Sequence, residues 1–229
     1  MIKAGIDQDA VATVFSTASA KQGENLRRVV CQATLKALQG RELTLENIRR
    51  VLKAVAVAST NGLAANPARA ADMRAMLSHV VQGMDAALLK AVQANRTALQ
   101  QFMDLGVGLQ NEQMKTALAN LERMEDVFVG VLGKVMQGAT ASVAGSWDKV
   151  LQGVKHDGTN AGAEASQVVA KLMAQSHAAL IKGRAANVRS AQAMMDNYAA
   201  LVSGVMLGMS EGMAEADKAP APTGRAKRK

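Results

Sequence analysis

The fold is decided by one long stretch, residues 67–104, which read PARAADMRAMLSHVVQGMDAALLKAVQANRTALQQFMD. Asn66 and Pro67 open it, and a capping residue followed by proline at the first helical position is a strong signal for the start of an α-helix. No further proline follows until Pro220. The apolar positions step by four and three, and they are Met73, Leu77, Val80, Met84, Ala87, Ala91, Ala94 and Ala98. This spacing predicts one helix, roughly 55 Å long at 1.5 Å per residue, with a heptad-like seam.

Apolar residues at helical spacing cover most of the remaining chain as well. Asp7 and Thr44 are suitable N-caps for two helices, and Asn61-Gly62 is a typical end for the second of these. The segments 105–108 and 156–158 contain glycine and are expected to break the helical pattern. Further helices are therefore predicted at about 8–19, 24–39, 45–59, 111–137, 142–155 and 164–215.

Large aromatic side chains are scarce, which constrains the kind of core that this chain forms. The 229 residues include five aromatics and 14 methionines. Leu, Val, Ala and Met must then supply the core, and such a core favours long helices that bury narrow stripes against one another. We predict an all-α fold, an elongated amphipathic helical bundle with coiled-coil character. Its expected parts are a basic N-terminal helical region (1–66), a long-helix bundle (67–217) and a disordered basic tail (218–229).

The net charge of +8 is concentrated at the two ends of the chain. Residues 1–74 hold 11 Lys and Arg against 6 Asp and Glu, and residues 218–229 hold 5 against none. The tail residues Arg225, Lys227, Arg228 and Lys229 are candidates for contact with an anionic surface. A solubilising terminus is the alternative interpretation. No aromatic residues interleave the charges, so any nucleic-acid contact is expected to be weak and non-specific.

The residue types that carry catalysis or bind metals are sparse and scattered. His79, His156 and His177 have no Cys, His or carboxylate at ligand spacing. Cys31 stands alone, and the stretch from Gly130 to Lys134 lacks both the spacing and the hydroxyl residue of a phosphate-binding loop. We therefore expect no enzymatic activity, no cofactor and no metal.

The sequence also bears on where the protein resides. Asp7 and Asp9 occupy the place where a secretory signal would have its apolar segment. The longest apolar run, 198–209, is shorter than the ~20 residues that a membrane-spanning helix needs. We expect no transmembrane insertion and a cytoplasmic protein.

The last predicted helix has the most regular heptad pattern in the chain. Two adjacent rows recur every seven residues and form a seam of Val188, Ala191, Met195, Tyr198, Val202, Val205 and Met209. Such a seam favours a homo-oligomer, a partner helix or an apolar surface. A row of small residues, Gly204, Gly208 and Gly212, follows at steps of four. This row favours a close helix–helix contact, or else it reflects the tolerance of an apolar helix end for small residues.

Two related segments, residues 95–100 (NRTALQ) and 187–192 (NVRSAQ), lie in alanine-rich predicted helices ahead of the basic Pro/Ala/Lys tail. In these features residues 67–218 resemble bacterial phasins and phasin-like proteins, which are helical, oligomeric coats of polyhydroxyalkanoate storage granules. The resemblance implies a non-enzymatic protein that coats apolar granules through amphipathic helices. The chain departs from that pattern in its N-terminal region and its short tail. A cytoplasmic scaffold that binds a partner helix, and a weak nucleic-acid-associated protein, are the alternatives.

Overall fold

The computed structural model describes residues 6–39, 44–105, 108–109 and 111–181, together with 202, 205 and 206. The regular structure within these residues is helical throughout, which confirms the predicted all-α class. The elements are α1 (Gln8–Thr17), the 3-10 turn η1 (Ala20–Gln22), α2 (Gly23–Leu38), α3 (Leu45–Ala64), α4 (Ala70–Asp104), α5 (Glu112–Glu122), α6 (Met124–Gln137), α7 (Ala141–Asp157) and α8 (Asn160–Ile181).

Two helix starts that depend on local capping agree with the prediction. The side chain of Asp7 accepts a hydrogen bond from the backbone N–H of Ala10 at 3.0 Å. Thr44 accepts one from the backbone N–H of Asn47 at 3.2 Å. Each satisfies a backbone donor that the first turn of a helix would otherwise leave without a partner.

The predicted end of α3 at Asn61-Gly62 is wrong, because the helix continues to Ala64. Gly62 lies where α3 crosses α1. A Cβ atom at Gly62 would overlap the backbone oxygen of Ala12 and would lie 2.7 Å from the Cβ of Phe15. The glycine is therefore required by close helix packing and not by a helix end.

The predicted start of α4 at Asn66-Pro67 is also wrong, since the helix begins at Ala70. Asn66 is buried and its amide Nδ2 donates hydrogen bonds to the backbone oxygens of Phe15 at 2.8 Å and Ala18 at 3.0 Å. Its Oδ1 accepts from the N–H of Ala68. Asn66 thus fixes the end of α1 against the α3–α4 connection.

Three other boundaries differ from the sequence-based expectation. The segment predicted as one helix over 111–137 is divided at Arg123 into α5 and α6. The helix predicted at 142–155 extends to Asp157, and α8 begins at Asn160 instead of 164. Of the predicted helix 164–215, the structure describes the part up to Ile181 as α8.

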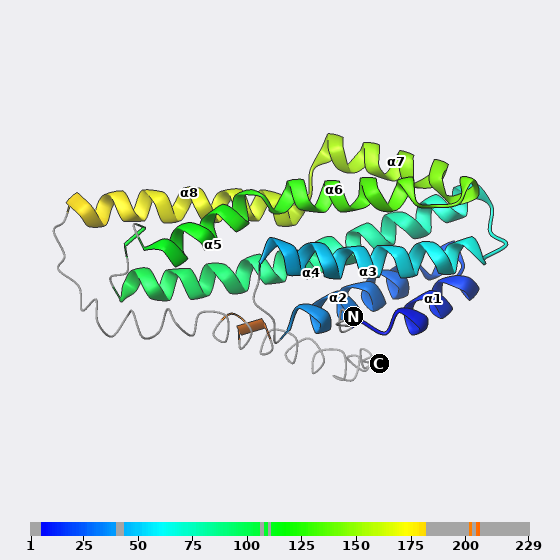
Figure 1. Cartoon of the computed structure of the whole chain (residues 1–229), viewed down its shortest axis with the longest axis horizontal. Helices are drawn as coiled ribbons and strands as arrows, with labels where there is room; N and C mark the ends of the chain where they lie inside the picture. The colour runs from blue at the N-terminus through cyan, green and yellow to red at the C-terminus, as the bar shows by residue number, and fades with distance from the viewer. Residues whose placement is uncertain are drawn as a thin grey trace, which may run out of the picture.

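The helices form an elongated bundle in which α4 runs along the length of the molecule (Figure 1). At one end of the bundle α8 packs on α4 and α5 packs on α8, while toward the other end α2 and α7 pack on α4 and α1 and α6 pack on α3 (Figure 1). Helix α2 packs closely on α4. At this crossing Gly83 faces the backbone of Arg27 and the side chain of Val30.

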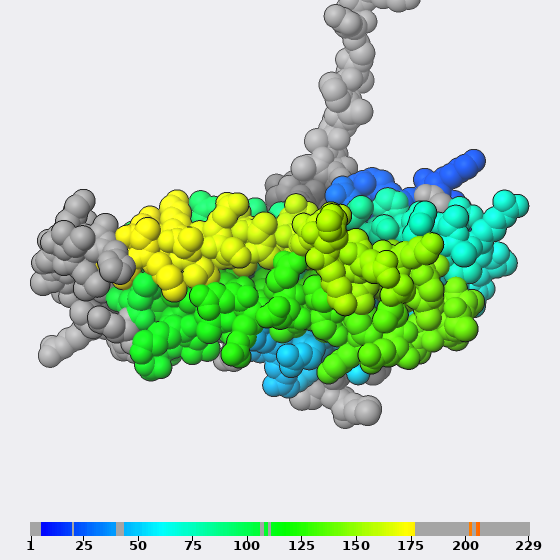
Figure 2. Space-filling model, turned by 90° about the horizontal axis from the view of Figure 1, so that it is seen from above, coloured from blue at the N-terminus to red at the C-terminus, as the bar shows by residue number. Residues whose placement is uncertain are grey.

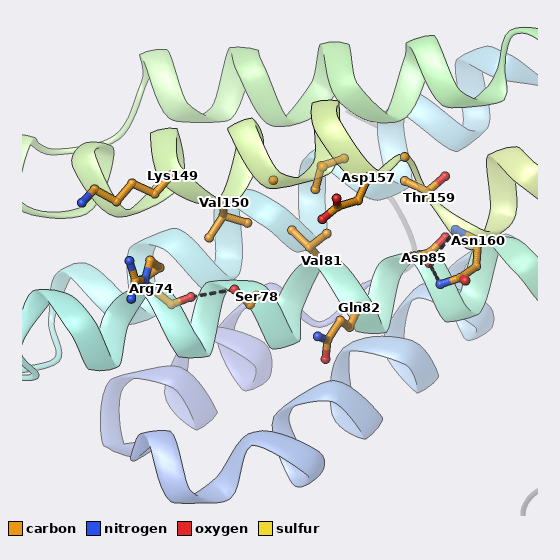
Figure 3. Close-up of a pocket in the computed structure, with 13 residues that line it drawn as sticks. Arg74, Ser78, Val81, Gln82, Asp85, Lys149, Val150, Asp157, Thr159 and Asn160 are labelled. Carbon is orange, nitrogen blue, oxygen red and sulfur yellow. Dashed lines mark hydrogen bonds between the residues drawn. The ribbon is translucent and has the colours of Figure 1, made fainter.

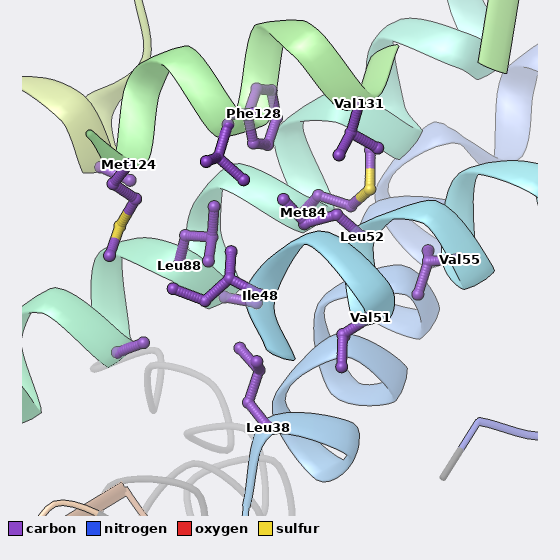
Figure 4. Packing of buried hydrophobic residues seen from close by; sticks show 14 of the residues in the cluster. Leu38, Ile48, Val51, Leu52, Val55, Met84, Leu88, Met124, Phe128 and Val131 are labelled. Carbon is purple, nitrogen blue, oxygen red and sulfur yellow. The ribbon is translucent and has the colours of Figure 1, made fainter. Parts of the chain in front are cut away.

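One hydrophobic cluster extends through the bundle. Figure 4 shows side chains from the N-terminal helices, among them Ile48 and Leu52, packed near Met84 and Leu88 of α4 and Phe128 of α6. Residues 6–39 and 44–66 therefore pack onto the long-helix region. The predicted domain boundary after residue 66 lies in the α3–α4 connection, and the tail 218–229 lies outside the described residues.

Candidate functional site

The structure describes two residues of the predicted C-terminal seam. Val202 is 2% exposed and belongs to the core cluster, and Val205 is partly buried against it. These two positions contact the chain's own core. The other predicted contact residues lie outside the described part of the chain, and they are Val188, Ala191, Met195, Tyr198, Gly204, Gly208, Met209, Gly212, Arg225, Lys227, Arg228 and Lys229.

The side chains considered for catalysis are placed apart on different elements. His79 on α4 lies over the first residue of α2, and its Nδ1 is 3.2 Å from Oε1 of Gln82. His156 is exposed near the end of α7. Cys31 is half-buried on α2, and burial raises the pKa of its thiol while Lys90 and Arg27 act in the opposite direction. The groups near this thiol are thus cations instead of a catalytic base.

A groove of about 330 Å³ lies between α4 and α7 (Figure 3). Val81 and Val150 form an apolar middle section, with Arg74 and Lys149 toward one end and Asp157 toward the other (Figure 3). Gly153 leaves open space in the wall, because no atom lies within 4 Å of the position its Cβ would occupy. The two cations at one end and the carboxylate at the other give the groove ends of opposite charge, which suits the binding of a small polar group.

A polar cluster stands at the end of this groove, where α7 turns into α8. We call Asp85, Glu125, Thr159, Asn160 and Gly162 the α8 corner. Asp85, only 6% exposed, comes from α4. Its Oδ2 accepts hydrogen bonds from the backbone N–H of Asn160 at 3.1 Å and from Nδ2 of the same residue at 2.7 Å. Its Oδ1 accepts from the N–H of Ala161 at 2.9 Å.

Glu125 of α6 provides the second half of the α8 corner. Its Oε1 accepts from the backbone N–H of Thr159 at 3.0 Å, and its Oε2 accepts from the Thr159 hydroxyl at 2.6 Å. The Thr159 Oγ1 in turn accepts from the N–H of Gly162 at 2.9 Å. A Cβ at Gly162 would overlap the Glu125 carboxylate, so the carboxylate keeps this position only beside a glycine. Two carboxylates from α4 and α6 thereby satisfy the first turn of α8, where the helix dipole also favours negative charge.

Sequence reasoning missed the α8 corner. Asp85 and Glu125 occupy positions that read as the polar sides of helices, and their partners lie 34 to 76 residues away in the chain. One local signal was present: Thr159-Asn160 directly after Gly158 is a typical capping sequence for a helix start. Gly158 has φ of 74°, which marks the turn that redirects the chain into α8.

A second groove, of about 380 Å³, lies between α3 and α6. Val127 and Val131 form part of its apolar lining, and the charged residues along it are Arg49, Arg123, Lys134 and Asp126. These three cations make no ion pair within the described part of the chain. The groove is therefore a site where an anionic group would be attracted.

The described residues offer few other features for binding. Among them, no group of three or more His, Cys, Asp or Glu could hold a metal ion. Within the same residues, none of the helices combines the length and apolar character needed to cross a membrane. Leu105, at 39% exposure, and Met173, at 45%, are the exposed large hydrophobic side chains of this part of the chain.

Comparison with known proteins identifies a family and no function. No curated protein and no solved structure matches the chain. The model of a family described as "Family of unknown function (DUF6781)" matches residues 1–215, which is nearly the whole sequence. The chain therefore belongs to the DUF6781 family.

Proposed function

We propose that this protein is a non-enzymatic coat protein whose amphipathic helices bind the surface of an apolar storage granule, in the manner of a phasin. The observation that carries the proposal is how the apolar side chains are arranged. Each of the longer described helices has one buried apolar stripe and one polar face, and the stripes pack against one another in one hydrophobic cluster. Such helices can exchange contact with each other for contact with another apolar surface.

Burying the apolar stripes is favourable both within the bundle and on an apolar surface. Burial of apolar surface contributes about 25 cal/mol per Å² whether the surface is covered by another helix or by a polymer. Among the described residues the exposed large hydrophobic side chains are few, so this part of the bundle must open in part for extended contact. Leu and Met side chains suit a disordered apolar surface because they adapt to irregular shapes more readily than aromatic rings.

The test is co-sedimentation of the purified chain with polyhydroxybutyrate particles, at low and at high salt. Apolar adsorption is expected to persist at high salt, because screening weakens charge contacts and leaves hydrophobic contacts intact. Hydrophilic silica particles of the same size are the control surface. A protein that stays in the supernatant with both kinds of particle overturns the proposal. Val202→Asp is unsuitable as a loss-of-binding variant, because Val202 is buried in the core.

The α3–α6 groove favours a second candidate function, which is contact with an anionic surface such as nucleic acid. Arg49, Arg123 and Lys134 gather there against the one carboxylate of Asp126. Binding of this kind is salt-sensitive because it releases counterions. Replacing the three cations by Gln should then abolish retention on a heparin column at low salt. Lys53, Lys155 and Lys171, which are exposed and lie outside the groove, serve as a matched control set for the same charge removal.

A further inference from the structure

We propose that α8 is a detachable cover, held closed by the α8 corner, and that the face beneath it on α4, α5 and α6 is the one that binds an apolar surface. This inference rests on the proposed function and deepens it by naming the face that makes the contact. It follows from three features of the structure: the polar attachment of α8, its light apolar packing and the short turn that connects it to α7.

The polar attachment is concentrated at one end of the helix. Asp85 and Glu125 together accept five hydrogen bonds from Thr159, Asn160 and Ala161. Farther along, the ion pair between Arg96 and Glu164 joins α8 to α4 at 3.2 Å. Charged hydrogen bonds are stronger than neutral ones and are directional, so loss of the α8 corner removes a large share of what positions α8.

The apolar attachment of α8 is light by comparison. Its buried apolar residues within the described part of the chain are Ala161, Ala165, Val168, Val169 and Leu172. The shorter helix α6 buries Met124, Val127, Phe128, Val131, Leu132 and Val135. Because smaller side chains bury less apolar area, α8 gains less from packing per residue than α6 does.

The position of α8 allows it to leave without disturbing the centre of the bundle. It lies on the surface of the molecule alongside α5 (Figures 1 and 2), and it packs against α4, α5 and α6. The connection to α7 consists of Gly158 and Thr159, and Gly158 has the φ of 74° that glycine adopts readily. Beneath α8, at the end of the bundle away from α1, lie α4 and α5, whose buried apolar side chains belong to the hydrophobic cluster of the bundle.

Hydrogen–deuterium exchange on the full chain tests whether α8 detaches separately. Asp85→Asn and Glu125→Gln each remove a charge and an acceptor from the α8 corner with little change of shape. Gly162→Ala disturbs the same corner by displacing the Glu125 carboxylate. Each variant should raise the exchange rate over residues 160–181 by about tenfold or more while α2 and α3 keep theirs. Glu122→Gln, three residues before Glu125 in sequence, exposed and outside the corner and both grooves, is the matched control and should change nothing.

Adsorption to polyhydroxybutyrate particles then tests the face beneath α8. If opening limits binding, the corner variants should adsorb about tenfold faster than wild type and Glu122→Gln. Unchanged exchange over 160–181, or equal loss of protection in α2 and α3, overturns the detachable cover. Faster exchange with wild-type adsorption overturns the assignment of the face. If the particles bind neither the wild type nor the variants, the proposed function is overturned, and the assignment of the face falls with it. The exchange data alone cannot overturn the proposed function.

Discussion

The indole Nε1 of Trp147 donates a hydrogen bond to the hydroxyl Oγ1 of Thr60 at 2.9 Å, and both side chains are buried. This contact joins α7 to α3 across 87 residues of sequence. Thr60 Oγ1 also donates to the backbone oxygen of Ala56 at 2.7 Å, so the hydroxyl is used both as donor and as acceptor. The single tryptophan of the chain is thus both a core residue and a polar tie between two helices.

A double-mutant cycle on this pair should reveal a coupling free energy of about 1 kcal/mol. Trp147→Phe leaves the Thr60 hydroxyl without its donor, and Thr60→Val leaves the indole N–H without its acceptor. The measurement is urea denaturation followed by circular dichroism at 222 nm. If the losses in free energy of unfolding caused by the two substitutions are additive, the hydrogen bond does not contribute to stability.

Asn66→Ala should destabilise the protein by about 2–3 kcal/mol. The substitution leaves the buried backbone oxygens of Phe15 and Ala18 without their donor, and buried groups without partners are costly. Denaturant midpoints measure the loss. Asn61→Ala, at an exposed position on α3, is the control and should stay within about 0.5 kcal/mol of wild type. Similar losses at the two positions would argue against the special role of Asn66.

Two glycine-to-alanine substitutions should shift stability in opposite directions. At Gly83 a Cβ would lie 2.6 Å from the backbone oxygen of Arg27, so Gly83→Ala should cost about 1–3 kcal/mol by forcing α2 and α4 apart. At Gly145, exposed in α7, no atom lies within 4 Å of the added Cβ. Gly145→Ala should stabilise the protein by about 0.5–1 kcal/mol through helix propensity. Thermal unfolding of both variants shows whether each substitution raises or lowers the stability of the protein.

The Cys31 thiol should react slowly while the protein is folded. Burial raises the pKa of this thiol, so less of it is thiolate near pH 8 than in the unfolded chain. Alkylation by iodoacetamide should be roughly tenfold slower in buffer than in concentrated urea at that pH. The folded rate should keep rising with pH beyond the point where the unfolded rate levels off. Equal rates in buffer and urea would contradict the half-buried position.

The same raised pKa of Cys31 means that the stability of the protein declines as the pH rises above the thiol's ordinary pKa, because the unfolded chain then loses this proton first.

Features that depend on a few neighbouring residues were predictable from sequence. Asp7 and Thr44 cap helices as expected, because each side chain reaches a backbone N–H only three residues ahead. The apolar steps through Met73, Leu77 and Met84 indicated the buried side of α4, and all three are buried. The scarcity of aromatic residues, together with long apolar stretches that lack proline, likewise indicated an all-α bundle.

Features that depend on distant partners were not predictable from one sequence. Gly62 read as a helix end, and only the crossing of α1 over α3 explains why a glycine lies within the helix. Asn66 read as a cap for α4, whereas its amide is used by α1. The α8 corner has the same origin, since nothing near Asp85 in sequence indicates that it will meet Asn160.

The sequence by itself determined that this chain forms amphipathic helices and which faces they bury, because hydrophobic periodicity and capping are local properties. Only the tertiary structure decided which helices approach closely and which buried polar groups satisfy one another. Those choices depend on where the bundle brings together residues that are far apart in the chain, and the cost of leaving a buried polar group without a partner then selects the pairs. Asp85 with the first turn of α8, and Trp147 with Thr60, are pairs of this kind.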